Sequence, residues 1–315
     1  MTPPLVTLDE IRAAAKNIAG IAVRTPLLPC LWADGLYLKP ENLQPVGAFK
    51  IRGAAQALAS LPAEVRAAGV VTESSGNHGQ ALAYAGRRLG APVVVVMPDV
   101  AVPSKIEATR LYGAEVMLVP AAERSSQRDR IARERGLTYV PPYDSPDIIA
   151  GQGTIGLEVF EDLSDADNVV VPVGGGGLAS GVATAIRSLA PHVTVIGVEP
   201  ELAADAAESL AAGEVRIWPT ERTYRTAADG LRTHLSALTL AHLQAYLAGI
   251  VTVTEEEILS TVAVLARSAR IVAEPSGAVA AAAFLHHRDE LPAGRTVAVV
   301  SGGNIDPDLL ARVLR

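Results

Sequence analysis

The chain has 315 residues and a formal net charge of -7 at pH 7; 49% of its residues are hydrophobic, 19% charged and 4% aromatic. This composition excludes a disordered chain and favours an α/β core built from alanine, valine and leucine. Because there is no excess of basic residues to bind nucleic acid or an anionic membrane surface, we expect the partner to be a small molecule.

The length is sufficient for two lobes, since single cores stop growing at about 250–300 residues. Cys30 is the one cysteine, which excludes an internal disulfide and a zinc site of cysteines. The N-terminal segment MTPPLVTLDEIRAAAKN has no basic-then-apolar signal pattern, and no apolar run reaches the length of about 20 residues that spans a bilayer. We therefore expect a cytoplasmic protein.

The predicted elements alternate along the chain. Thr7 and Glu10 have the spacing of a capping box and predict a helix that begins at once. Apolar runs predict strands at 69–72, 93–97, 115–119, 168–173, 194–198 and 296–300. Amphipathic stretches predict helices at 77–90, 104–112, 123–135, 178–190, 255–270 and 276–287. Strands that are apolar at every position are typical of parallel sheets covered by helices on both faces, so the predicted class is α/β.

The first candidate site segment is KPENLQPVGAFKIRGA at 39–54, which brings Lys50 to the start of a helix. A lysine in a partly dry pocket has a lowered pKa, and its neutral amine can attack an aldehyde. From the spacing alone, a lone lysine is more often a solvated surface residue, and this segment by itself does not exclude that interpretation.

Three further polar segments follow predicted strands. Ser74, Ser75, Gly76, Asn77 and His78 lead into a helix whose free N–H groups can bind a carboxylate or a phosphate, or whose start the serine or asparagine side chains simply cap. Gly174, Gly175, Gly176 and Gly177 follow the strand at 168–173 and permit backbone amides to surround a phosphate, although a tight turn is the alternative. Ser301 to Asn304 follow the last strand.

Ligands of open α/β sheets bind beyond the carboxyl ends of the strands, where all these segments fall. Each segment is a weak signal when taken alone. Together they predict one cleft with an amine, a phosphate-binding loop, an anion-binding helix start and a serine. The Pro/Tyr/Asp-rich segment at 140–147 is predicted to be a hinge between the two lobes.

These motifs resemble those of the fold-type II pyridoxal-phosphate enzymes, in particular the threonine dehydratase and serine racemase family. The resemblance covers nearly the whole chain and rests on GAFKIRGA, SSGNHGQAL, IAGQGTIGLE, VPVGGGGL, IGVEP, VTEEEI, EPSGA and SGGN, in the order of the family. It implies a tryptophan synthase β-like fold of two domains, each a mostly parallel open sheet covered by helices. A large cofactor-binding domain would comprise 1–67 and 145–315, and a small mobile domain 68–144.

The resemblance also implies a role for individual residues. Lys50 would bind pyridoxal 5'-phosphate and act as the catalytic base, with Ser75 as a second acid or base on the opposite face. The other cofactor-binding residues would be Phe49, Asn77, Gly174, Gly175, Gly176, Gly177, Leu178, Glu274 and Ser301. Glu274 is open to the alternative that it only begins a helix. The substrate carboxylate would bind to Ser74, Ser75, Gly76, Asn77 and His78.

In the segment GVEPELAADAA, the resemblance places a divalent-cation site on Glu199, the carbonyl of Ala203 and Asp205. Such oxygen ligands suit magnesium, calcium or manganese. The implied activity is dehydration of L-threonine or L-serine to 2-oxobutanoate or pyruvate and ammonia, by a homodimer. Alternatives are a serine racemase, a threo-3-hydroxyaspartate ammonia-lyase, a β-replacement enzyme and, from another class, a non-catalytic pyridoxal-phosphate-binding protein.

Overall fold

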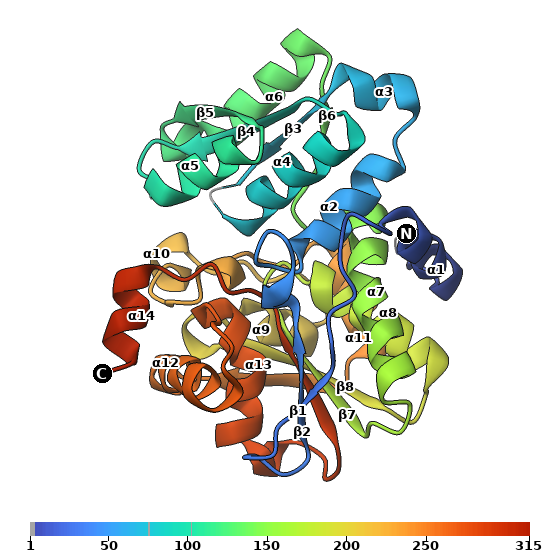
Figure 1. Cartoon of the computed structure of the whole chain (residues 1–315), viewed down its shortest axis with the longest axis vertical. Coiled ribbons are helices and arrows are strands. Elements are labelled where there is room, and N and C mark those ends of the chain that lie inside the picture. The colour runs from blue at the N-terminus through green and yellow to red at the C-terminus, as the bar shows by residue number, and fades with distance from the viewer. Residues whose placement is uncertain (1–3, 75, 102) are drawn as a thin grey trace.

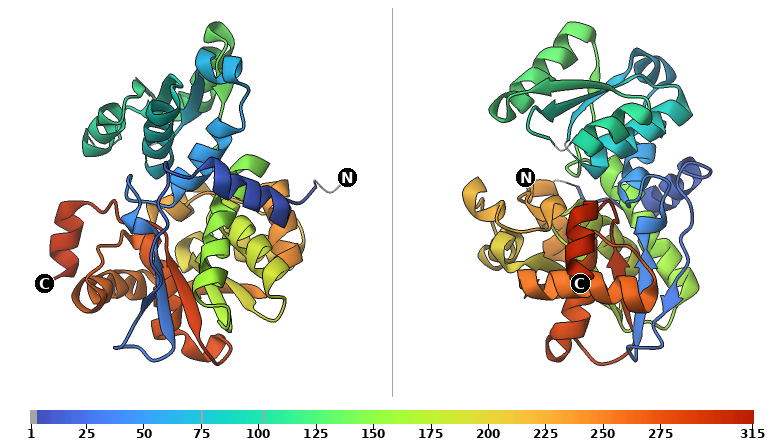
Figure 2. Two further views of the ribbon diagram at one scale, coloured as in Figure 1. Left: turned by 45° about the vertical axis from the view of Figure 1, so that its right-hand side comes forward. Right: turned by 60° about the vertical axis from the view of Figure 1, so that its left-hand side comes forward.

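The computed structural model describes residues 4–74, 76–101 and 103–315. Within these residues the chain forms two lobes stacked along the long axis, each built on one sheet (Figures 1 and 2). The large lobe has six strands in the order β1-β2-β10-β7-β8-β9, and the small lobe has four in the order β5-β4-β3-β6. All neighbouring strands are parallel except β1 and β2. The predicted α/β class with two mostly parallel sheets is confirmed.

The strands are short and apolar. In the large sheet they are β1 (Leu28–Pro29), β2 (Leu36–Pro40), β7 (Asn168–Pro172), β8 (Thr194–Pro200), β9 (Gly249–Val253) and β10 (Thr296–Val300). In the small sheet they are β3 (Val70–Glu73), β4 (Val93–Pro98), β5 (Glu115–Val119) and β6 (Thr138–Tyr139).

Helices cover both sheets. The first seven are α1 (Leu8–Asn17), α2 (Lys50–Ala59), α3 (Ala63–Ala68), α4 (Asn77–Leu89), α5 (Pro103–Leu111), α6 (Arg124–Arg135) and α7 (Pro146–Asp162). The next seven are α8 (Gly177–Leu189), α9 (Asp205–Ala212), α10 (Thr220–Thr223), α11 (Ala237–Tyr246), α12 (Glu255–Val264), α13 (Pro275–His286) and α14 (Pro307–Val313). Short helical turns include η1 (Glu41–Leu43), η3 (Glu201–Ala203) and η4 (Asp229–Leu231).

Alternate residues of the central strands face different cores, which explains why these strands are apolar at every position. Val169 and Val171 of β7 pack on the side of α7 and α8, whereas Val170 packs on the side of α12 and α13. In β4 of the small lobe, Val95 faces α2 and α4 while Val94 faces α6. Side chains alternate across a strand, so burial on both faces requires an unbroken apolar run.

One predicted helix differs from the structure, and several observed elements, among them α7, α11, β2 and β9, are not among the predicted ones. The helix expected at 255–270 is regular only to Val264; a π-helical turn, Leu265–Ala269, follows and ends at Arg270, whose φ is +58°. The 17-residue helix α7 was not expected, because its glycine-rich IAGQG segment weakens a helical signal. The capping box of α1 is present, since the Glu10 amide donates to Thr7 Oγ1 and the Thr7 amide donates to Glu10 Oε2.

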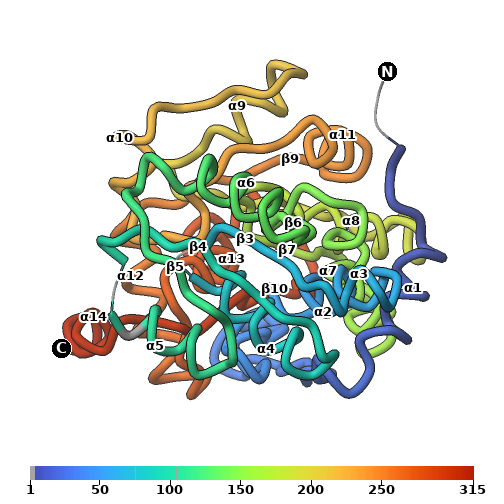
Figure 3. The backbone as a smooth tube through the Cα atoms, turned by 90° about the horizontal axis from the view of Figure 1, so that it is seen from above, coloured from blue at the N-terminus to red at the C-terminus, as the bar shows by residue number. Residues whose placement is uncertain are grey.

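The lobes meet where α2 crosses the start of α7; α2 lies between the lobes, and α7 runs on beside α8 along the large lobe (Figure 1). A Cβ at Gly151 would lie 2.6 Å from the Arg52 carbonyl oxygen, so a larger residue there would separate the two helices. Seen from above, the small sheet lies over the centre of the large one (Figure 3). The segment 140–147 connects β6 to α7, and its action as a hinge stays a prediction. No helix in the described residues is both long and apolar enough to cross a bilayer.

Candidate active site

A cavity of about 460 Å³ lies between the lobes, at the carboxyl ends of β3, β7 and β10. Its walls contain nearly all of the residues that the sequence had predicted for the cofactor and the substrate. These are Phe49, Lys50, Ser74, Gly76, Asn77, His78, Gly174, Gly175, Gly176, Gly177, Leu178, Glu274 and Ser301. Ser75, the remaining one, lies outside the described residues.

Lys50 is the first residue of α2 and projects into this cavity. Its Nζ donates a hydrogen bond to the Pro142 carbonyl oxygen at 2.8 Å and lies 5.1 Å from the centre of the Phe49 ring. The surrounding protein excludes water from the ammonium group, and this desolvation lowers the pKa of Lys50 to about 8. A substantial fraction of the amine is therefore neutral, and nucleophilic, near pH 7.5.

A buried ionic cluster fixes the start of α2, and the sequence reasoning missed it. Arg52, 1% exposed, donates from Nε to Glu41 at 2.7 Å and from Nη1 to Glu158 at 2.6 Å. Lys39 donates to the same Glu158 at 2.6 Å. The available signal was the presence of Lys39, Glu41 and Arg52 close to Lys50 in the sequence. Because α2 is joined to β2 and α7 through these bonds, Lys50 is held at the floor of the cavity.

The glycine loop after β7 has a backbone geometry suited to binding a phosphate. Gly176 has φ +84° and precedes α8, whose first N–H groups have no partner within the helix. A Cβ at Gly174 would lie 2.9 Å from the Leu231 Cα, and one at Gly175 would lie 2.5 Å from the Tyr143 ring. Side chains are therefore excluded from the loop, and backbone amides are left to bind an anion.

The start of α4 is a second position at which an anion could bind. Its N-cap residue is Gly76, which has no side chain with which to cap the helix. The Gly76 amide donates to Ser74 Oγ at 3.2 Å. The helix start therefore favours a carboxylate through its N–H groups and its dipole.

Asn77 connects the lobes inside the cavity. Its Nδ2 donates to Glu274 Oε1 at 2.6 Å, and its Oδ1 accepts from Asn304 Nδ2 at 2.7 Å. Burial raises the pKa of Glu274 to about 7, with Asp229 contributing in the same direction. Glu274 is the N-cap residue of α13, but its side chain caps no helical amide and instead contacts Asn77, which favours the interpretation of a polar group at the cavity.

His78 is a neutral side chain in this site. Its Nε2 lies 3.3 Å from the Val140 carbonyl oxygen, an acceptor, so this nitrogen carries the proton. Burial and the nearby Lys50 lower the pKa of His78 to about 3. Its Nδ1 is buried without a partner among the described residues, and it can accept a hydrogen bond from a ligand.

Ser301 closes the site at the end of β10. Its side chain is buried, and its Oγ donates to the Ser276 carbonyl oxygen at 3.2 Å. Tyr143 lies against the glycine loop and has its pKa raised to about 12, mainly by burial. Both hydroxyls are therefore neutral at physiological pH and act as hydrogen-bonding groups.

The predicted cation site is formed by β8, η3 and the start of α9. Glu199 and Asp205 are 1% and 2% exposed, and the Glu199 carboxylate accepts from the amides of Ala206 and Ala207 at 3.0 and 2.7 Å. Both carboxylate oxygens of Asp205 are buried without a partner among the described residues. Burial raises the pKa of Asp205 to about 6 and that of Glu199 well above its ordinary value.

A divalent cation fits these residues, because two buried carboxylates carry a desolvation cost that a cation would remove. The described residues contain no cluster of three or more His, Cys, Asp or Glu side chains suited to a metal. A cation here would therefore depend on two carboxylates, the carbonyl of Ala203 and water.

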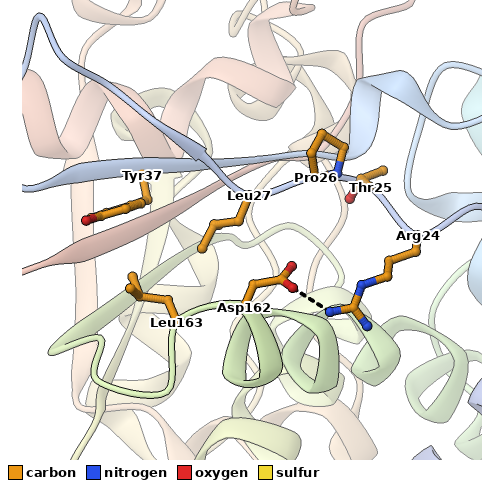
Figure 4. A pocket seen from close by; sticks show the side chains of 7 residues that line it. All are labelled: Arg24, Thr25, Pro26, Leu27, Tyr37, Asp162 and Leu163. Atoms are coloured by element: carbon orange, nitrogen blue, oxygen red, sulfur yellow. Dashed lines mark hydrogen bonds and ion pairs between the residues drawn. The ribbon is translucent and has the colours of Figure 1, made fainter.

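A second recess, of about 440 Å³, lies on the large lobe away from the predicted residues (Figure 4). Its charged residues, Arg24 and Asp162, are already paired, since the Arg24 guanidinium binds Glu161 and Asp162. Tyr37, Leu27 and Leu163 form the apolar remainder of its wall. None of the residues predicted to act in chemistry lines it.

The main cavity combines a lysine of lowered pKa, a glycine loop at a helix start and a second helix start for a carboxylate. This combination defines a site for an aldehyde cofactor with a phosphate group and for an amino acid, that is, a pyridoxal-phosphate-dependent enzyme. The family model described as pyridoxal-phosphate dependent enzyme matches residues 18–302. The chain belongs to this family.

Individual relatives show which members of the family this chain resembles. The chain is 42% identical to the L-threonine ammonia-lyase of Thermotoga maritima, over 98% of this chain and 78% of that protein. It is 38% identical to the serine racemase of Schizosaccharomyces pombe, over 98% of both chains. The structure of maize serine racemase superposes with a TM-score of 0.94 at 34% identity and covers 98% of this chain and 97% of that one. The predicted likeness to threonine dehydratases and serine racemases is confirmed.

Proposed function

We propose that the protein is a pyridoxal-phosphate-dependent ammonia-lyase that converts L-threonine or L-serine to 2-oxobutanoate or pyruvate and ammonia. One observation carries the proposal: the Lys50 amine shares a cavity with two separate anion-binding helix starts, those of α4 and α8. A cofactor phosphate and a substrate carboxylate require two such positions. The relatives named above support the reaction class.

The cofactor fits the residues present. Lys50 would hold it covalently, the amides of the glycine loop would bind its phosphate, and Phe49 would pack against its ring. Asn77 and Ser301 would bind polar atoms of the ring, with Glu274 behind Asn77. A neutral serine, rather than a carboxylate, at the ring nitrogen leaves that nitrogen unprotonated.

Pyridoxal phosphate, when bound, withdraws electrons from the α-carbon of an amino acid and so makes its α-proton acidic. In the proposed reaction the amides around Ser74 and Asn77 bind and orient the substrate carboxylate. The Lys50 amine, freed by the substrate amine, removes the α-proton. The β-hydroxyl leaves as water, and the enamine product takes up water to give the 2-oxo acid and ammonia.

We propose that Glu199, Asp205 and the Ala203 carbonyl bind magnesium, calcium or manganese. Asp205 begins α9, and β8, which carries Glu199, pairs with β7, the strand that leads into the glycine loop. A cation there would fix β8 against α9, beside that loop. Its role would be structural.

Serine racemisation is the second candidate, because Ser75 could provide an acid or base on the face opposite Lys50. The same site could also take a 3-hydroxyaspartate. The test incubates the holoenzyme with L- and D-forms of threonine, serine and 3-hydroxyaspartate, and measures 2-oxo acid and the enantiomers of the remaining amino acid. Oxo acid from L-threonine or L-serine with little enantiomer supports the lyase, whereas accumulating D-serine supports the racemase.

The variant Ser75→Ala separates the two reactions. If Ser75 is the second acid or base, the variant loses racemisation and keeps most L-serine dehydration. Racemisation that persists in the variant would contradict this role. Absence of both products from every amino acid tested would favour a cofactor-binding protein without catalysis.

A further inference from the structure

An ion pair joins the two lobes at the edge of the cavity. Lys105 Nζ, on α5 of the small lobe, lies 2.6 Å from Asp229 Oδ2, on η4 of the large lobe. Both residues line the cavity. The described residues form fifteen other ion pairs. Each of these lies within a single lobe, with α2 counted as part of the large lobe.

At the cavity, the contacts between the lobes form an inner and an outer set; away from it, Arg88 donates to the Gly20 carbonyl oxygen and Tyr112 to the Pro45 carbonyl oxygen. The inner contact, from Asn77 to Glu274, lies at a carboxyl that is 4% exposed, and it uses groups that we assign to the cofactor. The Lys105 and Asp229 side chains are 24% and 39% exposed, so their contact lies at the solvent side of the cavity. Neither Lys105 nor Asp229 is assigned to the cofactor. Their ion pair can therefore form or break when the substrate binds, without disturbing the cofactor.

Asp229 is linked directly to the cofactor-binding part of the large lobe. The amide of the next residue, Gly230, donates to Ser276 Oγ at 2.9 Å, at the start of α13. Leu231, one residue further, packs so closely on the glycine loop that a Cβ at Gly174 would lie 2.9 Å from its Cα. Asp229 is therefore a fixed point, and motion of the small lobe would move Lys105 relative to it.

We propose that Lys105 and Asp229 are positioning residues that hold the small lobe closed over an amino acid in the cavity. The proposal rests on the proposed function, since it assumes an amino-acid substrate. A partly exposed ion pair shifts an equilibrium by only about two- to fivefold. That strength favours the closed arrangement without trapping the product, as closure in each turnover requires.

A loss of closure and a direct effect on the charge of Glu274 predict different results for the two variants. Both Lys105→Gln and Asp229→Asn break the pair, so both would lower the population of the closed, substrate-binding arrangement. Their effects on the charge of Glu274 are opposite, because Lys105 lowers the pKa of that carboxyl and Asp229 raises it. A shared direction of change therefore identifies closure.

The test compares holoenzymes carrying Lys105→Gln, Asp229→Asn and, as control, Arg135→Gln. Arg135 pairs with Glu115 at 2.7 Å wholly within the small lobe. Steady-state rates with L-serine and L-threonine and hydrogen exchange of the α5 amides are measured. We expect both cavity variants to raise KM about two- to fivefold with a smaller change in kcat, and to exchange α5 amides faster in the presence of substrate. The control should change neither.

Effects of opposite sign on KM in the two variants would overturn the proposal, as would unchanged α5 exchange in both. A swap of the charges, Lys105→Asp with Asp229→Lys, should restore part of the protection from exchange; a swap no better protected than Lys105→Gln contradicts the pairing. Hydrogen exchange measures closure of the small lobe even when no reaction takes place. If the wild-type protein forms no oxo acid, the proposed reaction fails while the exchange data still decide on closure.

Discussion

The Lys50 amine donates a hydrogen bond of 2.8 Å to the carbonyl oxygen of Pro142, in the segment that connects β6 to α7. The reactive group of α2 is thus in contact with the link between the lobes. A neutral amine can still donate this bond, more weakly than an ammonium, and burial favours the neutral form. The chemistry of Lys50 therefore depends on how the lobes pack around it.

Lys50→Ala should abolish activity. Without the amine there is no covalent attachment of the cofactor and no base at the α-carbon, so we expect turnover to fall by at least about 10²- to 10⁴-fold. The absorbance band of the imine that Lys50 forms with the cofactor should be lost as well, even if the glycine loop retains free cofactor. Lys16→Ala on the exposed face of α1 is the control and should retain both. An absorbance band of the lysine–cofactor imine that survives in Lys50→Ala would disprove the assignment.

The rate at which the apoenzyme recombines with pyridoxal phosphate should increase with pH. Only the neutral amine attacks the aldehyde, and the pKa of Lys50 is lowered to about 8. The neutral fraction therefore increases from pH 6.5 to 8 and saturates above about 9. Stopped-flow absorbance at a series of pH values measures this. A rate that continues to increase tenfold per pH unit to pH 10 would indicate an ordinary lysine pKa.

Gly175→Ala should weaken retention of the cofactor. The added Cβ would lie 2.5 Å from the Tyr143 ring, so either the ring or the loop must move. We expect about a tenfold higher dissociation constant for pyridoxal phosphate, which corresponds to about 1.4 kcal/mol. Gly249→Ala, on β9, is the matched control because nothing lies within 4 Å of its Cβ position. Equal affinities in the two variants would argue against this loop as the phosphate site.

Magnesium should raise the melting temperature of the protein, and more so at pH 7.5 than at pH 5. The folded-state pKa of Asp205 is raised to about 6, so without a cation its stabilising effect is lost as the pH rises through 6. A cation binds the ionised form and reverses that loss. Asp205→Asn should abolish most of the response, while Glu214→Gln at the surface should keep it. A pH-independent response would point to a different site.

Arg52→Met should destabilise the fold. It leaves Glu41, which is fully buried, without its cationic partner and leaves Glu158 paired with Lys39 alone, at an expected cost of about 3–5 kcal/mol in the free energy of unfolding. Arg130→Met removes an exposed pair with Glu134 and should cost less than about 1 kcal/mol. Urea unfolding of both variants measures the difference. Similar costs would show that the cluster does not hold α2.

Much of the local structure could be predicted because its signals are short-range. The strands at 115–119 and 296–300 match β5 and β10, and the capping box at Thr7 begins α1 as expected. The prediction failed where packing overrides propensity. Helix α7 forms although glycine disfavours a helix, because Gly151 and Gly153 allow close packing against α2 and α8.

The sequence by itself determined the class of fold, the family and the residues that gather in the cavity, because apolar periodicity and motif order are properties of the chain alone. Only the tertiary structure decided how those residues act together. The contacts of Lys50 with Pro142, of Asn77 with Glu274 and of Lys105 with Asp229 join segments 92 to 197 residues apart. Their distances and desolvation arise from the packing of two lobes, which no local pattern specifies.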